Sequence, residues 1–150
     1  MIQRIQTVFL FLACLLTGLL FFIPFAGFVS GNIYNLTLMG ISSANIGDQI
    51  QQPYWLTGIG ALELILIFVA IFLFKNRKLQ MKITVVALFA ALVLNGAMFL
   101  VLNTFKSTLL SDPVYKIGFI FPLIAAILLF LAYRSINKDE QLIKSLDRLR

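Results

Sequence analysis

Residues 55–74 read WLTGIGALELILIFVAIFLF, and residues 83–102 read ITVVALFAALVLNGAMFLVL. The stretch between them, KNRKLQMK, carries four basic residues. An α-helix of about 20 residues spans roughly 30 Å, which is the thickness of the hydrocarbon core of a bilayer. Both runs are continuously apolar, whereas the strands of an outer-membrane barrel alternate apolar and polar residues. The sequence therefore predicts two antiparallel membrane-spanning helices joined by a short basic loop.

Two further apolar segments, at about residues 5–29 and 117–133, flank this pair. Apolar residues make up 61% of the 150-residue chain and charged residues only 12%, against roughly 25% charged in an ordinary soluble domain. A soluble domain of that length still exposes about 30% of its unfolded surface, so lipid must be the solvent for most of this chain. We predict an all-α membrane protein: a four-transmembrane-helix bundle over residues 1–133, followed by a cytoplasmic amphipathic helix over residues 134–150.

A cleaved signal peptide is the alternative for the first segment, because Arg4 precedes its apolar stretch. However, the stretch is long for such a peptide, and no A-x-A cleavage pattern follows it. We therefore expect a retained first helix.

The basic residues are distributed unevenly about the predicted spans. Ten of the twelve lie at one side: Arg4, Lys75, Arg77, Lys78, Lys82, Arg134, Lys138, Lys144, Arg148 and Arg150. Lys106 and Lys116 lie at the other side. Because Lys and Arg accumulate on the cytoplasmic side, we predict a multi-pass protein of the bacterial inner (cytoplasmic) membrane with both termini in the cytoplasm. These flanking residues account for the net charge of +6, and we expect the lipid bilayer, not a nucleic acid, as their partner.

The outer loop at residues 30–54 predicts a small periplasmic β-hairpin over the mouth of the bundle. Its first strand is expected over residues 32–41, where apolar and polar residues alternate. Gly40 and residues 42–45 predict the turn, and residues 46–52 predict a weaker second strand.

The last residues of the chain have the pattern of an amphipathic helix. Its apolar stripe is formed by Ile136, Leu142, Ile143, Leu146 and Leu149. Charged residues fill the other face, among them Lys144 and Arg148. We expect this helix either to continue the fourth span or to turn along the membrane surface, and to bind anionic lipid, a partner protein or both.

Glu63 is the one acidic or basic residue deep within a predicted span. At 1.5 Å per residue it lies about 12 Å from Trp55. Asn95 on the third span has a similar depth, and Thr17 on the first span lies slightly deeper. One interpretation is a proton- or cation-responsive site lined by these three polar residues. The other is a neutral Glu63 hydrogen-bonded to Asn95 between helices. We favour the second, because an ion pathway usually contains several ionisable groups.

Residues that carry common enzyme chemistry are scarce. The chain has no His and a single Cys, Cys14, which excludes the usual zinc sites, Ser-His-Asp and Cys-His catalysis, and an intrachain disulfide. The acidic residues do not have the paired spacing of a glycosidase, and the glycines form no phosphate-binding motif. We therefore expect no catalytic residues, no metal, no cofactor and no enzymatic activity.

Both ends of the chain carry a recognisable pattern. The N-terminus reads MIQRIQT, and the C-terminal part contains Lys138-Asp139-Glu140, Leu142, Ile143, Ser145 and a closing DRLR. With four predicted spans in 150 residues, the chain resembles the Bacteroidota membrane-protein family known as domain of unknown function 4293. The resemblance implies a four-span protein of the bacterial inner membrane, and it implies no activity.

Two functions remain open from the sequence. The first is a structural or accessory subunit of a larger membrane complex, because a compact bundle without a catalytic constellation carries a charged amphipathic tail that suits a membrane-protein partner. The alternative is a small transporter or channel that uses the intramembrane Glu63.

Overall fold

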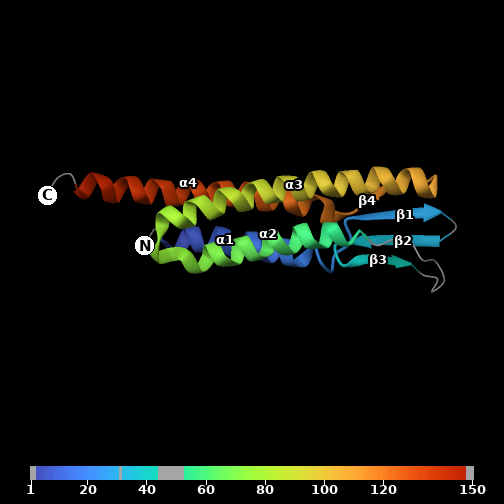
Figure 1. The fold of residues 1–150 in the computed structure, drawn as a ribbon, viewed down its shortest axis with the longest axis horizontal. Helices are drawn as coiled ribbons and strands as arrows, with labels where there is room; N and C mark the ends of the chain where they lie inside the picture. The colour runs from blue at the N-terminus through green and yellow to red at the C-terminus, as the bar shows by residue number, and fades with distance from the viewer. Residues whose placement is uncertain (1–2, 31, 44–52, 148–150) are drawn as a thin grey trace.

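The computed structural model describes residues 3–30, 32–43 and 53–147. Figure 1 shows four helices running side by side along the long axis, with a group of strands at one end. The elements follow in the order α1 (Gln3–Leu19), β1 (Ala26–Ser30), β2 (Asn32–Thr37), β3 (Gly40–Ser43), α2 (Tyr54–Phe72), η1 (Leu73–Lys75), α3 (Arg77–Leu109), β4 (Val114–Tyr115), η2 (Ile117–Ile120) and α4 (Phe121–Asp147). We call the end with the strands the sheet end. The other end, where α1 begins, α2 and α3 connect and α4 ends, is the terminal end.

Each helix of the bundle packs against two others: α1 and α3 both contact α2 and α4. The two apolar runs at the centre of the chain form α2 and α3, joined by η1 and by Asn76, whose side chain accepts a hydrogen bond from the Leu79 amide at 3.4 Å. Among the described residues, three helical segments are long and apolar enough to cross a membrane: Tyr54–Phe72, Arg77–Ser107 and Ile117–Leu142. The apolar part of α1, Ile5–Leu19, is shorter.

The prediction of one continuous span over residues 5–29 is wrong. The helix ends at Leu19, and the last part of the segment forms β1, which pairs antiparallel with β2. Pro24 prevents a continuous helix, because a proline lacks the amide hydrogen that the helix needs and its ring clashes with the preceding turn. Phe25, Ala26 and Phe28, which follow, are buried at the sheet end within the protein itself.

The small antiparallel sheet has the strand order β3-β2-β1-β4. In its register, Ala26 of β1 lies opposite Leu36 of β2 on one side and opposite Tyr115 of β4 on the other. The Lys116 amine donates a hydrogen bond to the Asn35 side chain at 2.6 Å. This contact ties the connection between α3 and α4 to the hairpin.

The structure has a hairpin in this loop, but it is formed by β2 and β3 and not by the predicted strands over residues 32–41 and 46–52. β2 and β3 are joined at Leu38 and Met39, and Gly40–Ser43 forms a strand where the sequence pattern predicts a turn. Gly40 has a φ of 146°, an angle that residues with a Cβ rarely adopt, so the chain reverses earlier than the alternation of apolar residues indicates. The predicted second strand, residues 46–52, lies outside the described residues.

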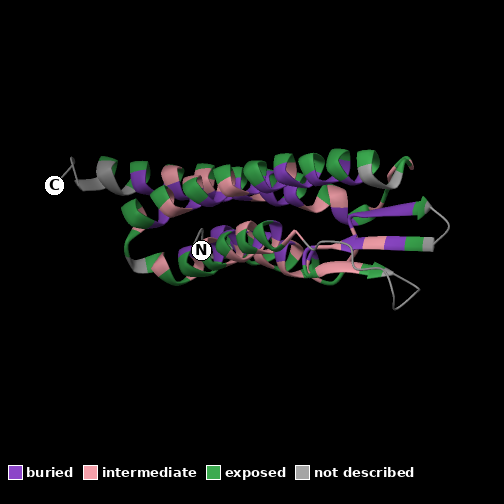
Figure 2. Cartoon of the chain, turned by 45° about the vertical axis from the view of Figure 1, so that its right-hand side comes forward, coloured by how far each residue is buried: buried purple, intermediate pink, exposed green. Residues whose placement is uncertain are grey.

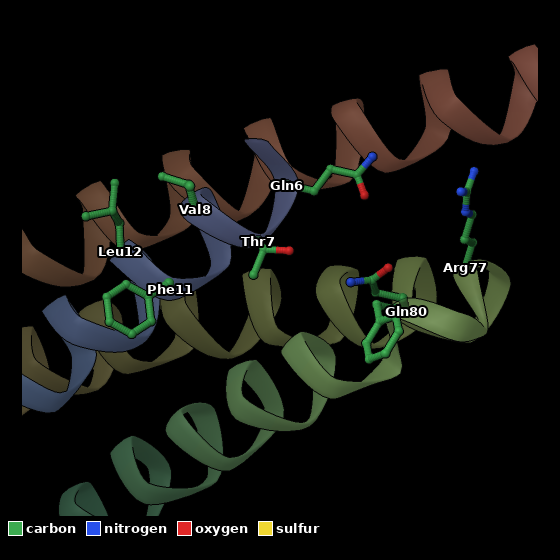
Figure 3. A pocket seen from close by; sticks show the side chains of 8 residues that line it. Gln6, Thr7, Val8, Phe11, Leu12, Arg77 and Gln80 are labelled. Atoms are coloured by element: carbon green, nitrogen blue, oxygen red, sulfur yellow. The ribbon is translucent and has the colours of Figure 1, made fainter. Parts of the chain in front are cut away.

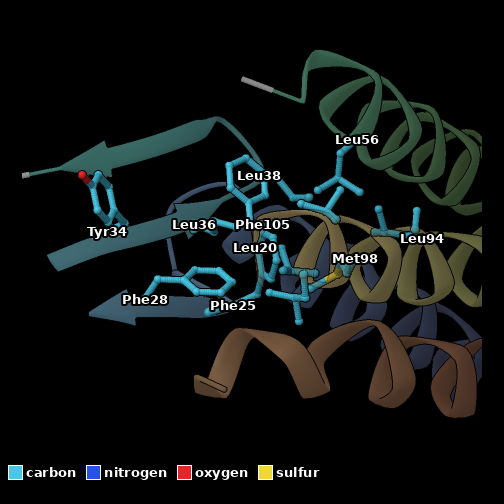
Figure 4. Close-up of a cluster of buried hydrophobic side chains, with 14 residues drawn as sticks. Leu20, Phe25, Phe28, Tyr34, Leu36, Leu38, Leu56, Leu94, Met98 and Phe105 are labelled. Atoms are coloured by element: carbon cyan, nitrogen blue, oxygen red, sulfur yellow. The ribbon is translucent and has the colours of Figure 1, made fainter. Parts of the chain in front are cut away.

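Two clusters of buried apolar side chains fill the interior, while exposed residues cover the outward faces of the helices (Figure 2). The sheet-end cluster (Figure 4) contains mostly large side chains: Leu20, Phe25, Phe28, Tyr34, Leu36, Leu38, Leu56, Leu94, Met98 and Phe105. The alanine cluster lies between the helices nearer the terminal end and contains many small side chains: Leu10, Ala13, Ile67, Ala70, Ala87, Ala91, Ala125, Ala126, Leu129 and Ala132.

α4 runs without interruption from the predicted fourth span into the predicted tail, so the tail continues the span instead of turning along a surface. Ile136, Asp139 and Glu140 are buried and still belong to the packed bundle. The last turns of α4 extend past the start of α1 and past the α2–α3 connection (Figure 1). We call residues 141–147 the α4 arm.

Candidate functional site

Glu63 lies at the midpoint of α2 and has no exposed surface. The Thr17 hydroxyl of α1 donates a hydrogen bond to Oε1 of Glu63 at 3.2 Å. The other carboxyl oxygen, Oε2, has no hydrogen-bond partner among the described residues. The structure therefore brings together two of the three polar residues that the sequence singles out, in a contact that joins α1 to α2.

Asn95 is not part of this contact, and the predicted hydrogen bond between Glu63 and Asn95 is wrong. The Asn95 side chain is partly buried and donates to the Phe119 backbone oxygen at 3.4 Å. Phe119 belongs to η2, directly before α4. Asn95 and Glu63 have a similar depth on neighbouring helices, but depth alone does not bring them together. Helix α3 packs against α4 as well as α2, and the Asn95 amide is directed to the α4 side.

Apolar side chains flank Glu63 on both sides along the buried stripe of α2. Toward the sheet end this stripe contains Gly60 and Leu56, and toward the terminal end it contains Ile67 and Ala70. Gly60 allows close packing, since a Cβ there would lie 2.7 Å from Cδ1 of Leu38. The carboxyl thus lies between the sheet-end cluster and the alanine cluster, where an ionised group is unfavourable unless a cation or several donors compensate it.

A second group of buried polar side chains closes the terminal end, and the sequence analysis missed it. The Gln6 amide of α1 donates to the Asp139 carboxyl of α4, and the Gln80 amide of α3 donates to the Ala70 carbonyl of α2 at 3.0 Å. The Thr84 hydroxyl donates to the Gln80 carbonyl at 2.8 Å. We call Gln6, Gln80, Thr84 and Asp139 the terminal polar group. Its contacts tie α1 to α4 and α3 to α2.

Two of these four residues, Gln80 and Thr84, could have been predicted to be buried from the helical spacing of their apolar neighbours. Gln80 and Thr84 stand in one stripe of α3 with Ala87, Ala91 and Leu94, at spacings of three and four residues. All five are buried, because residues at these spacings share one face of a helix. The apolar members of the stripe therefore predict burial of the polar ones.

A pocket of about 480 Å³ opens beside the terminal polar group (Figure 3). Its lining contains Gln6, Thr7, Val8, Phe11, Leu12, Phe74, Arg77 and Gln80. Figure 3 shows Val8, Phe11 and Leu12 along α1, and Gln6, Gln80 and Arg77 together toward one end of the pocket. The pocket is thus apolar along α1 and polar, with one cation, at the terminal end.

The predicted contact residues of the tail are only partly described. Leu142 is 46% exposed. Ile143, Lys144 and Leu146 belong to the part of α4 whose side chains are outside the described set, and Arg148 and Leu149 lie beyond residue 147. Within the described ranges, no three His, Cys, Asp or Glu side chains are placed to hold a metal ion.

Comparison with known proteins places the chain in a family. No curated protein matches it. The family described as "Domain of unknown function (DUF4293)" matches residues 2–149, nearly the whole chain. The chain therefore belongs to the DUF4293 family, as the sequence pattern of its two ends indicates.

Proposed function

We propose that this protein is a structural or accessory subunit of a larger complex in the bacterial inner membrane, without enzymatic activity of its own. The distribution of basic residues supports a cytoplasmic terminal end and a periplasmic sheet end. In this orientation the α4 arm enters the cytoplasm, where it meets either a partner protein or the headgroup region of the bilayer.

The observation that carries this proposal is the continuation of α4 beyond the other helices of the bundle (Figure 1). A helix end gains most of its stability from packing of its apolar face, and Leu142 is 46% exposed at the start of the arm. A membrane-protein partner that covers this face supplies the missing contact. Lys138 and Gln141, both exposed beside it, provide polar contacts at the rim.

The alternative function, a small transporter or channel that uses Glu63, depends on a path for ions or solutes through the bundle. The carboxyl lies between two apolar clusters and contacts one hydroxyl. The nearest buried acidic residues along the helices, Asp139 and Glu140, lie at the terminal end on the far side of the alanine cluster. This separation supports a structural role for Glu63 over a relay, which requires closely spaced ionisable groups.

A matched pair of substitutions in the α4 arm tests the subunit role. Leu142→Glu places a charge on the exposed apolar position, and Gln141→Glu places the same charge on the adjacent exposed polar position. We expect Leu142→Glu to lose the co-purifying partner in mild detergent at native expression levels, while Gln141→Glu retains it. Helix content and membrane insertion should be the same for both variants. A wild-type protein that stays monomeric under these conditions contradicts the proposal.

Flux measurements in reconstituted vesicles test the alternative. Glu63→Gln keeps the size of the side chain and removes its ability to ionise. If the wild-type protein carries ions and Glu63→Gln stops the flux, the transporter function replaces our proposal. We expect no flux with either protein.

A further inference from the structure

A second pocket at the terminal end, of about 590 Å³, lies between α3 and α4. Its lining includes Lys78 and Lys82, which are one helical turn apart on α3 and are both exposed. Val85 and Val86 follow on the same helix, and Val86 is 53% exposed. One wall of the pocket therefore changes from basic to apolar within two turns of α3.

This change in polarity coincides with the start of the apolar runs. Lys82 is the last charged residue before the apolar stretch of residues 83–102, and Tyr133 closes the apolar stretch of α4 and lines the same pocket. Tyrosine is enriched at the level of lipid headgroups, and lysine marks the aqueous side of that level. If α3 and α4 cross a membrane, the pocket opens at the boundary between headgroups and acyl chains.

We propose that this pocket binds one anionic glycerophospholipid, with its phosphate between Lys78 and Lys82 and one acyl chain along Val85 and Val86. Two ammonium groups one helical turn apart suit a phosphate, and basic pockets between membrane helices bind phospholipid headgroups in this way. Val86, which is exposed, and the half-buried Val85 supply the apolar contact that a free phosphate does not need. The lipid site needs only that α3 and α4 span the membrane, and is independent of the subunit role of the α4 arm.

Glu140 determines which headgroups the pocket accepts. It lines the pocket from α4, and its side chain is 9% exposed. It lines the pocket together with the two lysines, so replacing this acidic side chain by an amide should strengthen binding of an anionic lipid. A zwitterionic lipid with a primary ammonium, such as phosphatidylethanolamine, would instead use Glu140 and bind more weakly without it.

Native mass spectrometry of the detergent-solubilised protein with added lipid measures this binding. Phosphatidylglycerol, phosphatidylcholine and phosphatidylethanolamine with identical acyl chains are compared, together with soluble glycerol 3-phosphate as a headgroup without chains. We expect phosphatidylglycerol to bind most tightly and glycerol 3-phosphate not to compete at equal concentration. Equal binding of phosphatidylglycerol and phosphatidylcholine, or competition by glycerol 3-phosphate, overturns the proposal.

Substitutions locate the lipid on the protein. Lys78→Ala combined with Lys82→Ala should weaken phosphatidylglycerol binding about 25-fold, since each lysine near an anionic lipid contributes about fivefold. Lys138→Ala is the matched control, because Lys138 is an exposed lysine of α4 at the same end that does not line the pocket. Lys78→Ala and Lys82→Ala alone should each weaken binding about fivefold, and an equally large loss for Lys138→Ala would mean general attraction of charge and overturn the proposal. Tighter binding by Glu140→Gln supports it, whereas weaker binding by that variant together with a preference for phosphatidylethanolamine contradicts it.

Discussion

The sheet end and the terminal end of the bundle are closed by different kinds of side chain. At the sheet end, β1 and the residue directly before it supply large apolar side chains, Phe28 and Phe25, to the sheet-end cluster (Figure 4). At the terminal end, the terminal polar group ties the helices together, through hydrogen bonds between its side chains or to helix backbone. The Ala70 carbonyl, which accepts from Gln80, lies in the last turn of α2, where backbone carbonyls lose their partners within the helix.

The two ends differ in the length of the chain segments that connect the helices there. Between α1 and α2, the described residues form three strands. These strands place apolar side chains at the sheet end. α2 and α3 are joined only by η1 and Asn76. This connection is too short to cover the helix ends. Buried backbone groups at that end must be satisfied by polar side chains of the helices themselves. Four substitutions test this difference, and they follow in order of decreasing expected effect.

Phe28→Ala removes a fully buried ring from the sheet-end cluster, where it lies 6.3 Å from the ring of Phe105 between centroids. We expect the free energy of unfolding in lipid micelles to fall by about 3–5 kcal/mol, through lost burial and a new cavity. Phe22→Ala is the control, because Phe22 is 74% exposed, and it should change stability by less than about 0.5 kcal/mol. Equal effects would mean that apolar packing does not hold the sheet end.

Gln6→Ala removes the hydrogen bond between α1 and α4 at the terminal end. It leaves the buried Asp139 carboxyl without the amide that donates to it, and we expect a loss of about 1–3 kcal/mol, the cost of a buried polar group that loses its partner. Replacing both residues, with Gln6→Leu and Asp139→Leu, should destabilise the protein less than the sum of the two single changes. Strict additivity in this double-mutant cycle would show that the two side chains do not interact.

Gly118→Ala tests the close contact between η2 and the chain before β1. A Cβ on Gly118 would lie 2.8 Å from the Pro24 carbonyl oxygen, and the backbone cannot give way easily, so we expect a loss of about 1–3 kcal/mol. Gly96→Ala in α3 should stabilise by about 0.5–1 kcal/mol, since a Cβ there meets nothing within 4 Å. Thermal unfolding of both variants measures the contrast. Stabilisation by Gly118→Ala would refute the close approach at the sheet end.

Thr17→Val tests the polar contact between the two clusters and should have the smallest effect. It removes the hydroxyl that donates to Glu63, and such bonds between membrane helices average about 0.6 kcal/mol. A double-mutant cycle of Thr17→Val with Glu63→Leu should give a coupling of about that size. The same cycle with Asn95→Leu in place of Thr17→Val should give none, and a coupling there would reinstate the contact predicted from the sequence.

Part of this candidate site was predictable from sequence, and part was not. The burial of Glu63 followed from its position deep in an apolar run of helical length, since that run has to span or be buried. Its hydrogen-bond partner did not follow, because depth along a helix says nothing about rotation around the helix axis. In the structure, the Glu63 side chain contacts Thr17, and the Asn95 side chain contacts Phe119.

Hydropathy alone identifies which parts of the chain are apolar enough for a membrane, because it is a sum over neighbouring residues and needs no knowledge of contacts. The sequence predicts the apolar runs that form α2, α3 and the first part of α4, but it leaves open whether the tail continues α4 or turns along the membrane surface. That residues 26–30 form a strand and not the end of a span follows from tertiary contacts, because Ala26 and Phe28 are buried as well by the sheet and helices as they would be by lipid. The terminal polar group was decided in the same way, since its hydrogen bonds join residues as far apart as Gln6 and Asp139.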